Sequence, residues 1–288
     1  MTVPPDWPNA QHSRFVDVRP HRWHVQQMGT GPDLLMLHGA GAATHSWRAL
    51  APRLAPRLRL TMVDLPGHGF TRAGTRARSG LDPMAEDLEA LLDALHLDPA
   101  AILGHSAGAP LALRLSLDAG RHRPVVSING AFAKFDGVAG FLFPLVAKAL
   151  SLNPLTVPLF TLGASRSRTR RLLSATGSRI DPEGLAQYHR LISDRAHVAG
   201  ALAMMANWSL DGLLRDAVEH AAPVLLLAGG RDGTVPPKVS RDMARRLPDA
   251  RLVLEEDLGH LMHEEAAGRV APAVTGFLEQ AGTLARGA

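Results

Sequence analysis

The sequence predicts an α/β protein built on an open, mainly parallel β-sheet, and two patterns support this fold class. Short apolar runs bounded by turn residues are typical of buried parallel strands. They occur at residues 33–37, 58–63, 100–103, 124–128, 223–228 and 251–254. Segments with helical periodicity separate several of these runs, at residues 83–95, 107–117, 238–247 and 261–278. Strands that alternate with helices in this way favour a doubly wound sheet.

The order of these elements predicts a sheet core with an inserted cap. Residues 15–18 and 23–27 resemble an antiparallel hairpin that leads into the sheet. The alternation then stops between about residues 131 and 219, where helical patterns dominate, and it resumes with the strand at 223–228. We therefore predict a core formed by residues 1–130 and 219–288 and a helical cap formed by residues 131–218.

The composition fits a globular protein and excludes several functional classes. Of the 288 residues, 46% are hydrophobic and 20% are charged, which is enough apolar material to bury a large core. The formal net charge of +4 is too small for a typical nucleic-acid-binding protein, so we expect no nucleic-acid partner. Cysteine is absent, which excludes disulfides, thiolate zinc sites and a cysteine nucleophile. Because residues 1–15 also lack the apolar run of a secretion signal, we expect a cytoplasmic protein.

The first part of the cap region is unusually apolar. Residues 138–163 carry few polar side chains, but three prolines within them argue against a membrane-spanning helix. Five of the eight phenylalanines fall in or beside this stretch, namely Phe132, Phe135, Phe141, Phe143 and Phe160. Four arginines follow it, Arg166, Arg168, Arg170 and Arg171. One interpretation is an ordinary cap core, with the arginines on a solvated face. The other is an apolar surface that lines a pocket or contacts a membrane peripherally, with arginines that bind carboxylates or anionic lipid.

The motif GHSAG at residues 104–108 predicts a nucleophilic serine at position 106. It directly follows the strand at 100–103 and directly precedes a helical segment, which is the strand–turn–helix context of a nucleophile elbow. The turn strains the serine backbone, and the flanking glycines avoid collisions with neighbouring backbone.

A serine hydroxyl needs a base and an orienting acid, and the fold predicts that they follow in the order acid, then histidine. Asp232 follows the strand at 223–228, and His260 follows the strand at 251–254, so both lie where the carboxyl ends of parallel strands gather. Asp257, Asp216 and His263 are the weaker alternatives. His263 lies one turn into the next helix, where we expect it on the helix surface.

The oxyanion of an acyl-transfer intermediate needs two N–H donors. Ala107 supplies one at the start of the helix after the serine, and Ala40 supplies the other from the loop after the strand at 33–37. We expect His38 to stabilise that loop, and the Pro-Gly turn between Asp64 and His68 to hold a second loop beside the pocket.

Other cofactor chemistry finds no support in the sequence. Gly39 and Gly41 lack the third glycine of a dinucleotide-binding loop, no phosphate-binding Gly-Lys loop is present, and the zinc motif that begins at His263 would require histidine at position 267, where alanine stands. We therefore expect a reaction that needs no metal or organic cofactor.

Five motifs resemble those of the α/β-hydrolase fold superfamily across nearly the whole chain. They are LHGAGAATHSW, DLPGHGFT, GHSAG, GGRD and LGH. The resemblance implies an eight-stranded sheet, a cap after the sixth strand, and Ser106, Asp232 and His260 as a catalytic triad. The haloalkane dehalogenases and epoxide hydrolases of the superfamily carry aspartate where this chain has Ser106, which disfavours those two chemistries.

The motifs PPDWPN, SINGAF and MMANW more narrowly resemble the magnesium chelatase accessory proteins of bacteriochlorophyll gene clusters. That resemblance implies a role around magnesium insertion into protoporphyrin, with magnesium chelatase as a partner and a tetrapyrrole as the small apolar substrate. Two hypotheses follow. The chain is a serine hydrolase of esterase type, or it is a non-catalytic tetrapyrrole-binding or chelatase-assisting protein that kept the scaffold. Carbon–carbon hydrolases and cofactor-free peroxidases use the same triad, so the reaction subclass stays open.

Overall fold

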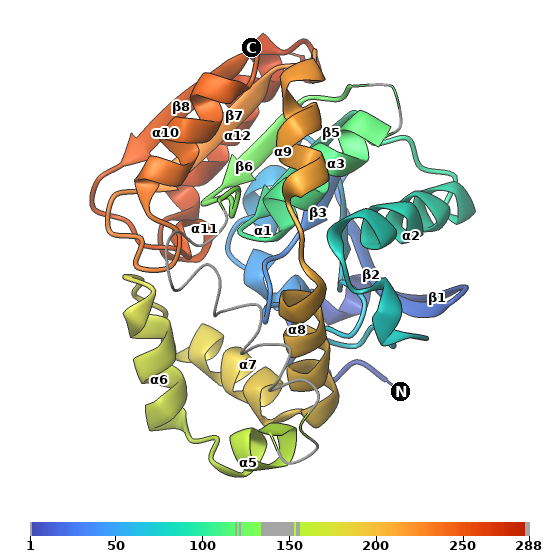
Figure 1. Ribbon diagram of the computed structural model, residues 1–288, viewed down its shortest axis with the longest axis vertical. Coiled ribbons are helices and arrows are strands. Elements are labelled where there is room, and N and C mark those ends of the chain that lie inside the picture. Colours follow the sequence, from blue (N-terminus) through green and yellow to red (C-terminus); the bar gives the residue numbers. More distant parts are fainter. Residues whose placement is uncertain (1, 119, 121, 134–152, 154–155, 286–288) are drawn as a thin grey trace.

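The protein has an eight-stranded sheet at its centre, and this confirms the predicted fold class. The computed structural model describes residues 2–118, 120, 122–133, 153 and 156–285. The strand order is β1-β2-β4-β3-β5-β6-β7-β8 (Figure 1). Strand β2 runs antiparallel to its neighbours β1 and β4, and all other neighbouring strands are parallel. The strands are β1 (Ser13–Val18), β2 (His21–Met28), β3 (Asp33–Leu37), β4 (Arg59–Val63), β5 (Ala101–His105), β6 (Val125–Ile128), β7 (Val224–Gly229) and β8 (Ala250–Glu255).

The central strands are continuous apolar runs because both faces of the sheet are covered. In β3, Leu35 and Leu37 belong to a cluster that includes side chains of the helices on one face, whereas Leu34 and Met36 belong to the cluster on the other face. Helices α2 (Leu81–Ala94), α3 (Gly108–Asp118) and α10 (Pro237–Arg246) contribute to the first cluster. Helices α1 (Ala51–Leu54) and α12 (Ala267–Gln280) contribute to the second. This packing aligns the carboxyl ends of the parallel strands along one edge.

The helix expected at residues 261–278 is in fact two helices. A short α11 (Met262–Glu265) ends at Ala266, whose φ of −138° and ψ of 45° are not helical, and α12 begins at the next residue. The Glu265 carboxylate accepts hydrogen bonds from the backbone N–H groups of Gly259, at 3.0 Å, and Arg179, at 2.9 Å. These contacts hold α11 against the loop that carries His260.

The described chain between β6 and β7, which falls within the predicted cap, forms helices. They are α5 (Thr156–Leu162), α6 (Arg166–Ala175), α7 (Pro182–Ser193), α8 (Arg195–Asn207), α9 (Asp211–Asp216) and the single turn η4 (Ala217–Glu219). Helices α5 to α8 lie on one side of the sheet core, and α9 returns along α3 (Figure 1). Most of the apolar stretch at residues 138–163, including Phe135, Phe141 and Phe143, lies outside the described residues.

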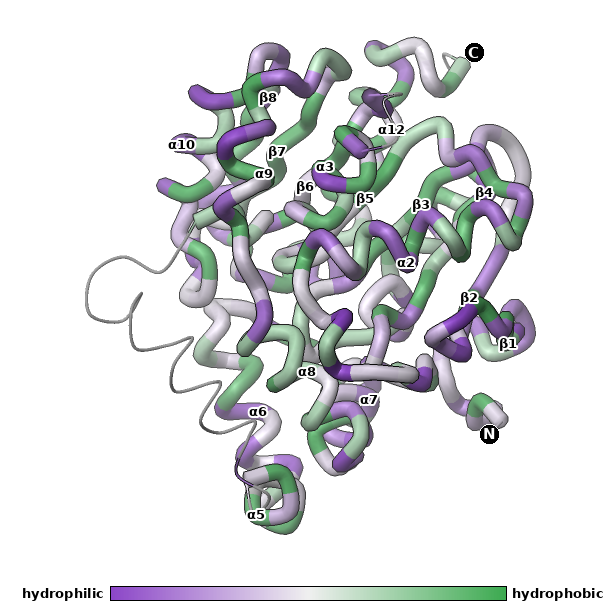
Figure 2. Tube along the Cα trace, turned by 45° about the vertical axis from the view of Figure 1, so that its right-hand side comes forward, coloured by the Kyte–Doolittle hydropathy of each residue, from purple (hydrophilic) through white to green (hydrophobic). Residues whose placement is uncertain are grey.

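No helix in the described ranges is long and apolar enough to cross a lipid bilayer. Hydrophobic positions are concentrated along the strands at the centre of the molecule and recur on α5 at its far end (Figure 2).

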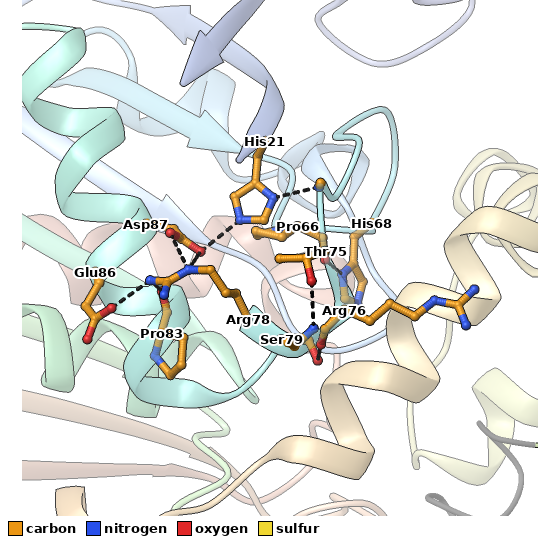
Figure 3. Close-up of polar contacts among 12 residues, drawn as sticks. His21, Pro66, His68, Thr75, Arg76, Arg78, Ser79, Pro83, Glu86 and Asp87 are labelled. Carbon is orange, nitrogen blue, oxygen red and sulfur yellow. Dashed lines mark hydrogen bonds and ion pairs between the residues drawn. The ribbon is translucent and has the colours of Figure 1, made fainter. Parts of the chain in front are cut away.

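A cluster of charged and polar side chains holds the hairpin end of the sheet. His21 accepts a hydrogen bond at Nδ1 from the Gly74 N–H and donates from Nε2 to Asp87, at 2.8 Å. Arg78 Nε–H donates to both carboxylate oxygens of Asp87, and the Arg78 guanidinium also reaches Glu86 (Figure 3). A cavity of about 400 Å³ is lined beside this cluster by Asp17, Arg19, Pro20, His21, Arg22, Arg72, Ala73 and Gly74. None of the predicted site residues lines this cavity, so the cavity is not part of the predicted active site.

Candidate active site

Ser106 lies in the sharp turn between β5 and α3. Its φ of 51° falls in the left-handed region, which is strained for a residue with a side chain. A Cβ atom at position 104 would lie 2.2 Å from the Gly108 carbonyl oxygen, and one at position 108 would lie 2.1 Å from the Leu37 carbonyl oxygen. Only glycine fits at these two positions, so the local sequence fixes the turn that presents the Ser106 side chain.

Asp232 and His260 form a hydrogen-bonded pair at the carboxyl ends of β7 and β8. The His260 Nδ1–H donates to Asp232 Oδ2 at 2.7 Å, and both residues are buried. Because an ionised carboxylate only accepts, this contact fixes the tautomer and leaves His260 Nε2 with its lone pair. The ring is thereby arranged as a base.

Asp232 is held by three further hydrogen bonds. The N–H groups of Thr234 and Val235 donate to Oδ1 at 2.7 and 2.8 Å, and the Asn129 side-chain amide donates to Oδ2 at 2.7 Å. Asn129 is not among the site residues that the motifs predict. Its position directly after β6, at the same sheet edge, was the signal that could have found it.

The alternative acids are engaged elsewhere. Asp257 pairs with Arg269 at 2.9 Å, and Asp216 pairs with Arg114 at 2.7 Å. The acid that contacts His260 is therefore Asp232.

Ser106 and His260 lie on adjoining loops without a direct hydrogen bond. Among the described residues, no hydrogen bond joins the Ser106 hydroxyl to His260. His105 bridges the two loops, because it precedes Ser106 in the chain and its Nε2 atom lies 2.9 Å from the His260 carbonyl oxygen. The rings of His105 and His260 are 4.8 Å apart. Catalytic contacts in ligand-free enzymes are often long and tighten when substrate binds, so the serine–histidine contact stays a prediction.

The two expected oxyanion donors flank Ser106. A Cβ atom at Gly39 would lie 2.8 Å from the Ser106 Cβ, so the loop that contains Ala40 passes directly against the serine. Within the described part of the chain, the backbone N–H groups of Ala40 and Ala107 donate to no acceptor. Unpaired donors beside a serine at a helix start are the arrangement that an oxyanion requires.

His38 stabilises the loop beside Ser106, as the sequence predicted. Its Nε2 accepts from the Leu65 N–H at 2.9 Å, and its Nδ1–H donates to the Gly39 carbonyl at 2.8 Å. Burial lowers the pKa of His38 to about 4, so the ring is neutral at physiological pH. Both nitrogens are occupied, which excludes His38 as the base.

Asp64 anchors the neighbouring loops. Its carboxylate accepts from the N–H groups of Thr44, at 2.7 Å, and Phe70, at 2.8 Å, and from His24, at 2.7 Å. Burial by itself would raise the pKa of Asp64, but the charge and hydrogen bond of His24 outweigh it and hold that pKa below its usual range.

The contact between Asp64 and His24 is part of a second hydrogen-bonded series of hydroxyl, imidazole and carboxylate. His24 Nε2 lies 3.0 Å from the Ser13 hydroxyl, while its Nδ1 contacts Asp64. Ser13 is in strand β1, however, and the Gln26 amide donates to its oxygen at 3.0 Å. Because Ser13 is not at the start of a helix, the series Ser13–His24–Asp64 lacks the N–H donors that flank Ser106. We regard this series as structural.

The expectation that His263 lies on the helix surface is wrong. It is fully buried, with its ring 4.3 Å from that of His105 and 4.9 Å from that of Trp47. Its Nε2 lies 2.7 Å from the Ser46 hydroxyl. The short helix α11 turns inward against residues that are more than 150 positions away in the chain, which local periodicity could not reveal.

Glu264, which lies on the same short helix α11, connects the loop of His260 to the predicted cap. Its buried carboxylate accepts hydrogen bonds from the hydroxyls of Ser46, at 2.9 Å, and Tyr188, at 2.7 Å, and from the Arg48 guanidinium. Tyr188 lies on α7, and Arg48 also reaches Asp181 at the start of α7. A single ionic cluster therefore connects the His260 loop with the helical insertion.

His197 on α8 makes a second connection, to the loop of Ala40. Its Nδ1 accepts from the Gly69 N–H at 3.0 Å, and its Nε2–H donates to the Gly41 carbonyl at 3.1 Å. Burial lowers the pKa of His197 to about 4, and burial with the nearby His197 ring lowers the pKa of His68 to about 3. Three neutral histidines, counting His38, thus fill the space between the cap and the loops beside Ser106.

These histidines predict a loss of stability in mild acid. Between pH 6.5 and about 4 the unfolded chain binds protons that the folded chain does not, so the free energy of unfolding falls as pH falls. Each histidine contributes about 1.4 kcal/mol per pH unit to this slope. Urea unfolding between pH 7 and pH 5 should show it. His197→Gln keeps a donor and an acceptor and should reduce the slope by about one proton, and an unchanged slope would contradict the assignment.

The described residues contain no group of three or more histidine, aspartate or glutamate side chains placed to hold a metal ion.

A family model described as the alpha/beta hydrolase fold matches residues 32–267 of this sequence. The chain belongs to the α/β-hydrolase family. It is 47% identical over 280 residues to the magnesium-chelatase 30 kDa subunit of Rhodobacter capsulatus, a match that covers 96% of this chain and 98% of that protein. This agrees with the narrower resemblance of its motifs.

Two further comparisons agree with the family assignment. It is 30% identical to the pimeloyl-[acyl-carrier protein] methyl ester esterase of Nitrosospira multiformis, over 83% of this chain and 91% of that protein. An α/β-hydrolase fold protein from Burkholderia ambifaria superposes with a TM-score of 0.73 at 22% identity, over 91% of this chain and 97% of that one. The second likeness concerns the fold alone.

Proposed function

We propose that the protein is a serine hydrolase that cleaves an ester of an apolar carbonyl compound. The observation that carries the proposal is the 2.7 Å contact between His260 and Asp232, on the loop that adjoins the strained turn of Ser106. A buried carboxylate that orients an imidazole beside a serine is the arrangement that activates a hydroxyl.

The residues divide the reaction as follows. Ser106 Oγ attacks the carbonyl carbon while His260 Nε2 takes its proton, and Asp232 stabilises the imidazolium that forms. The N–H groups of Ala40 and Ala107 bind the oxyanion. When the tetrahedral intermediate collapses, His260 returns the proton to the leaving alkoxide and an acyl-serine remains. Water then attacks the acyl-serine with His260 as base, which releases the acid and regenerates the enzyme.

We further propose that this chemistry serves bacteriochlorophyll biosynthesis around magnesium insertion into protoporphyrin. Support comes from the similarity to a magnesium-chelatase subunit along nearly the whole chain. The similarity to methyl ester esterases favours an ester as the reacting group. On this proposal the substrate is an apolar tetrapyrrole, the partner is magnesium chelatase, and residues 131–218 form the cap above a core of residues 1–130 and 219–288.

The second candidate is a tetrapyrrole-binding or chelatase-assisting protein without catalysis. Two observations favour it: the name of the relative at 47% identity, and the missing hydrogen bond between Ser106 and His260. Fold alone does not decide between binding and catalysis.

A fluorophosphonate probe separates the two candidates. An activated serine should react with it, so the wild-type chain should be labelled at Ser106 and the Ser106→Ala variant should not. Ser13→Ala is the matched control, since Ser13 also contacts a histidine–aspartate pair, and it should be labelled like the wild type. An unlabelled wild type, or equal labelling of Ser106→Ala, would leave the binding protein as the better description.

A further inference from the structure

The outer end of the described cap combines exposed leucines with exposed arginines. Leu159 and Leu162 on α5 leave 66% and 76% of their surface exposed. On α6, Leu172 is 44% exposed, and three arginines, Arg166, Arg170 and Arg171, are exposed as well. We call these six residues the cap tip. Both views place α5 and α6 at the end of the molecule opposite the C-terminal residues (Figures 1 and 2).

The charge of the cap tip is of one sign. Residues 156–175 include four arginines and no aspartate or glutamate. Elsewhere arginines such as Arg78, Arg114 and Arg269 bind carboxylates. Among the described residues, no ion pair involves Arg166, Arg170 or Arg171. A basic surface for which the described residues supply no counter-charge at these three arginines is complementary to an anionic one.

We infer that the cap tip docks on an anionic lipid bilayer. Leu159 and Leu162 are three residues apart, so they project from the same face of α5 and can enter the acyl boundary together. The arginines that follow on α6 are placed to bind lipid phosphates. The binding hot spots of protein interfaces are enriched in tryptophan, tyrosine and arginine, whereas leucine is under-represented there. The protruding leucines are therefore the feature that favours a membrane surface over a protein partner, whereas the arginines suit either.

Helix α6 connects the cap tip with the candidate active site. It begins at Arg166 and ends just before Thr176, whose carbonyl oxygen accepts hydrogen bonds at 3.1 Å from the N–H groups of both Gly233 and His260. Ten helical residues span about 15 Å, so docking would place the His260 loop one short helix from the lipid. An apolar ester dissolved in the bilayer would then have a short path to Ser106. This last step rests on the proposed function, whereas the docking itself does not.

Vesicle sedimentation of the purified full chain tests the docking. Vesicles of phosphatidylcholine with 30 mol% phosphatidylglycerol should bind the protein, and vesicles of phosphatidylcholine alone should bind it at least tenfold more weakly. The Arg170→Glu/Arg171→Glu variant should lower the partition coefficient at least tenfold, and Leu159→Ser/Leu162→Ser should lower it even at low salt. The matched controls are Arg53→Glu/Arg241→Glu, which changes net charge equally at exposed sites, and Val218→Ser, which removes another exposed apolar side chain.

Three outcomes would overturn the inference: no sedimentation with the phosphatidylglycerol vesicles, equal binding to both vesicle types, or equal losses in the cap-tip and control variants. Circular dichroism and the urea midpoint should show that each variant folds. A cap-tip variant that loses capture of magnesium-chelatase subunits while vesicle binding is unchanged would assign the surface to a protein partner instead. Fluorophosphonate labelling of Ser106 needs no vesicles, so a failure of docking remains distinct from a failure of the proposed hydrolase.

Discussion

Replacing His260 with alanine should lower kcat/KM for p-nitrophenyl acetate by about 10⁴-fold. The variant loses the base for Ser106 and the acid for the leaving group, while the N–H groups of Ala40 and Ala107 remain. Asp232→Asn should have an effect of similar size for a different reason. Three N–H donors and the Asn129 amide already surround this carboxylate, so an amide in its place would bring N–H groups against N–H groups and would no longer fix the His260 tautomer. Initial rates across pH 6–9 would measure both effects.

His12→Ala is the control for this experiment, because His12 is partly exposed and lies in the turn before β1, away from the three strand ends that carry the site. It should retain activity within about twofold of the wild type, as surface substitutions usually do. If His260→Ala also retained activity within tenfold, the base would have to be a different residue and the assignment of the triad would fail.

Local sequence was sufficient to predict the sheet and the His260–Asp232 pair. The apolar runs of β3 and β7 identify buried strands, because helices cover both faces of those strands. Parallel strands bring their carboxyl ends to one edge, so a serine after β5, an aspartate after β7 and a histidine after β8 had to lie near one another. The distance between the last two could thus be anticipated from topology.

The features that could not be predicted from the sequence depend on contacts between distant segments. The burial of His263 requires Ser46 and Trp47, and the role of His197 requires the loops at Gly41 and Gly69. The periodicity of residues 261–278 predicts one amphipathic helix and gives no sign of the break at Ala266. At that break, Glu265 accepts a hydrogen bond from the backbone N–H of Gly259, a contact outside the helix. Such features follow from which loops face each other across the site, and no local propensity encodes them.

Arg48→Met should lower the free energy of unfolding by about 3–5 kcal/mol, the usual cost of removing one partner from a buried ion pair. The Arg48 side chain is 7% exposed and that of Glu264 is fully buried, so the substitution leaves a carboxylate without its counter-charge inside the protein. The hydroxyls of Ser46 and Tyr188 still donate to Glu264 but supply no charge. Burial raises the pKa of Tyr188 to about 12, so its hydroxyl stays protonated and remains a neutral hydrogen-bond donor to Glu264. Urea unfolding at pH 7 would measure the loss.

The double variant Arg48→Met/Glu264→Met distinguishes a lost ion pair from lost packing. Replacing both charges with apolar side chains of similar length removes the uncompensated charge, and buried pairs replaced in this way are often neutral or stabilising. The double variant should therefore recover at least half of the stability that Arg48→Met loses. If it is less stable than the single variant, the aliphatic part of Arg48 and its contact with Asp181 on α7 dominate instead. In that case packing rather than charge holds α7 against the core, and neutralising Arg48 and Glu264 would not weaken that contact.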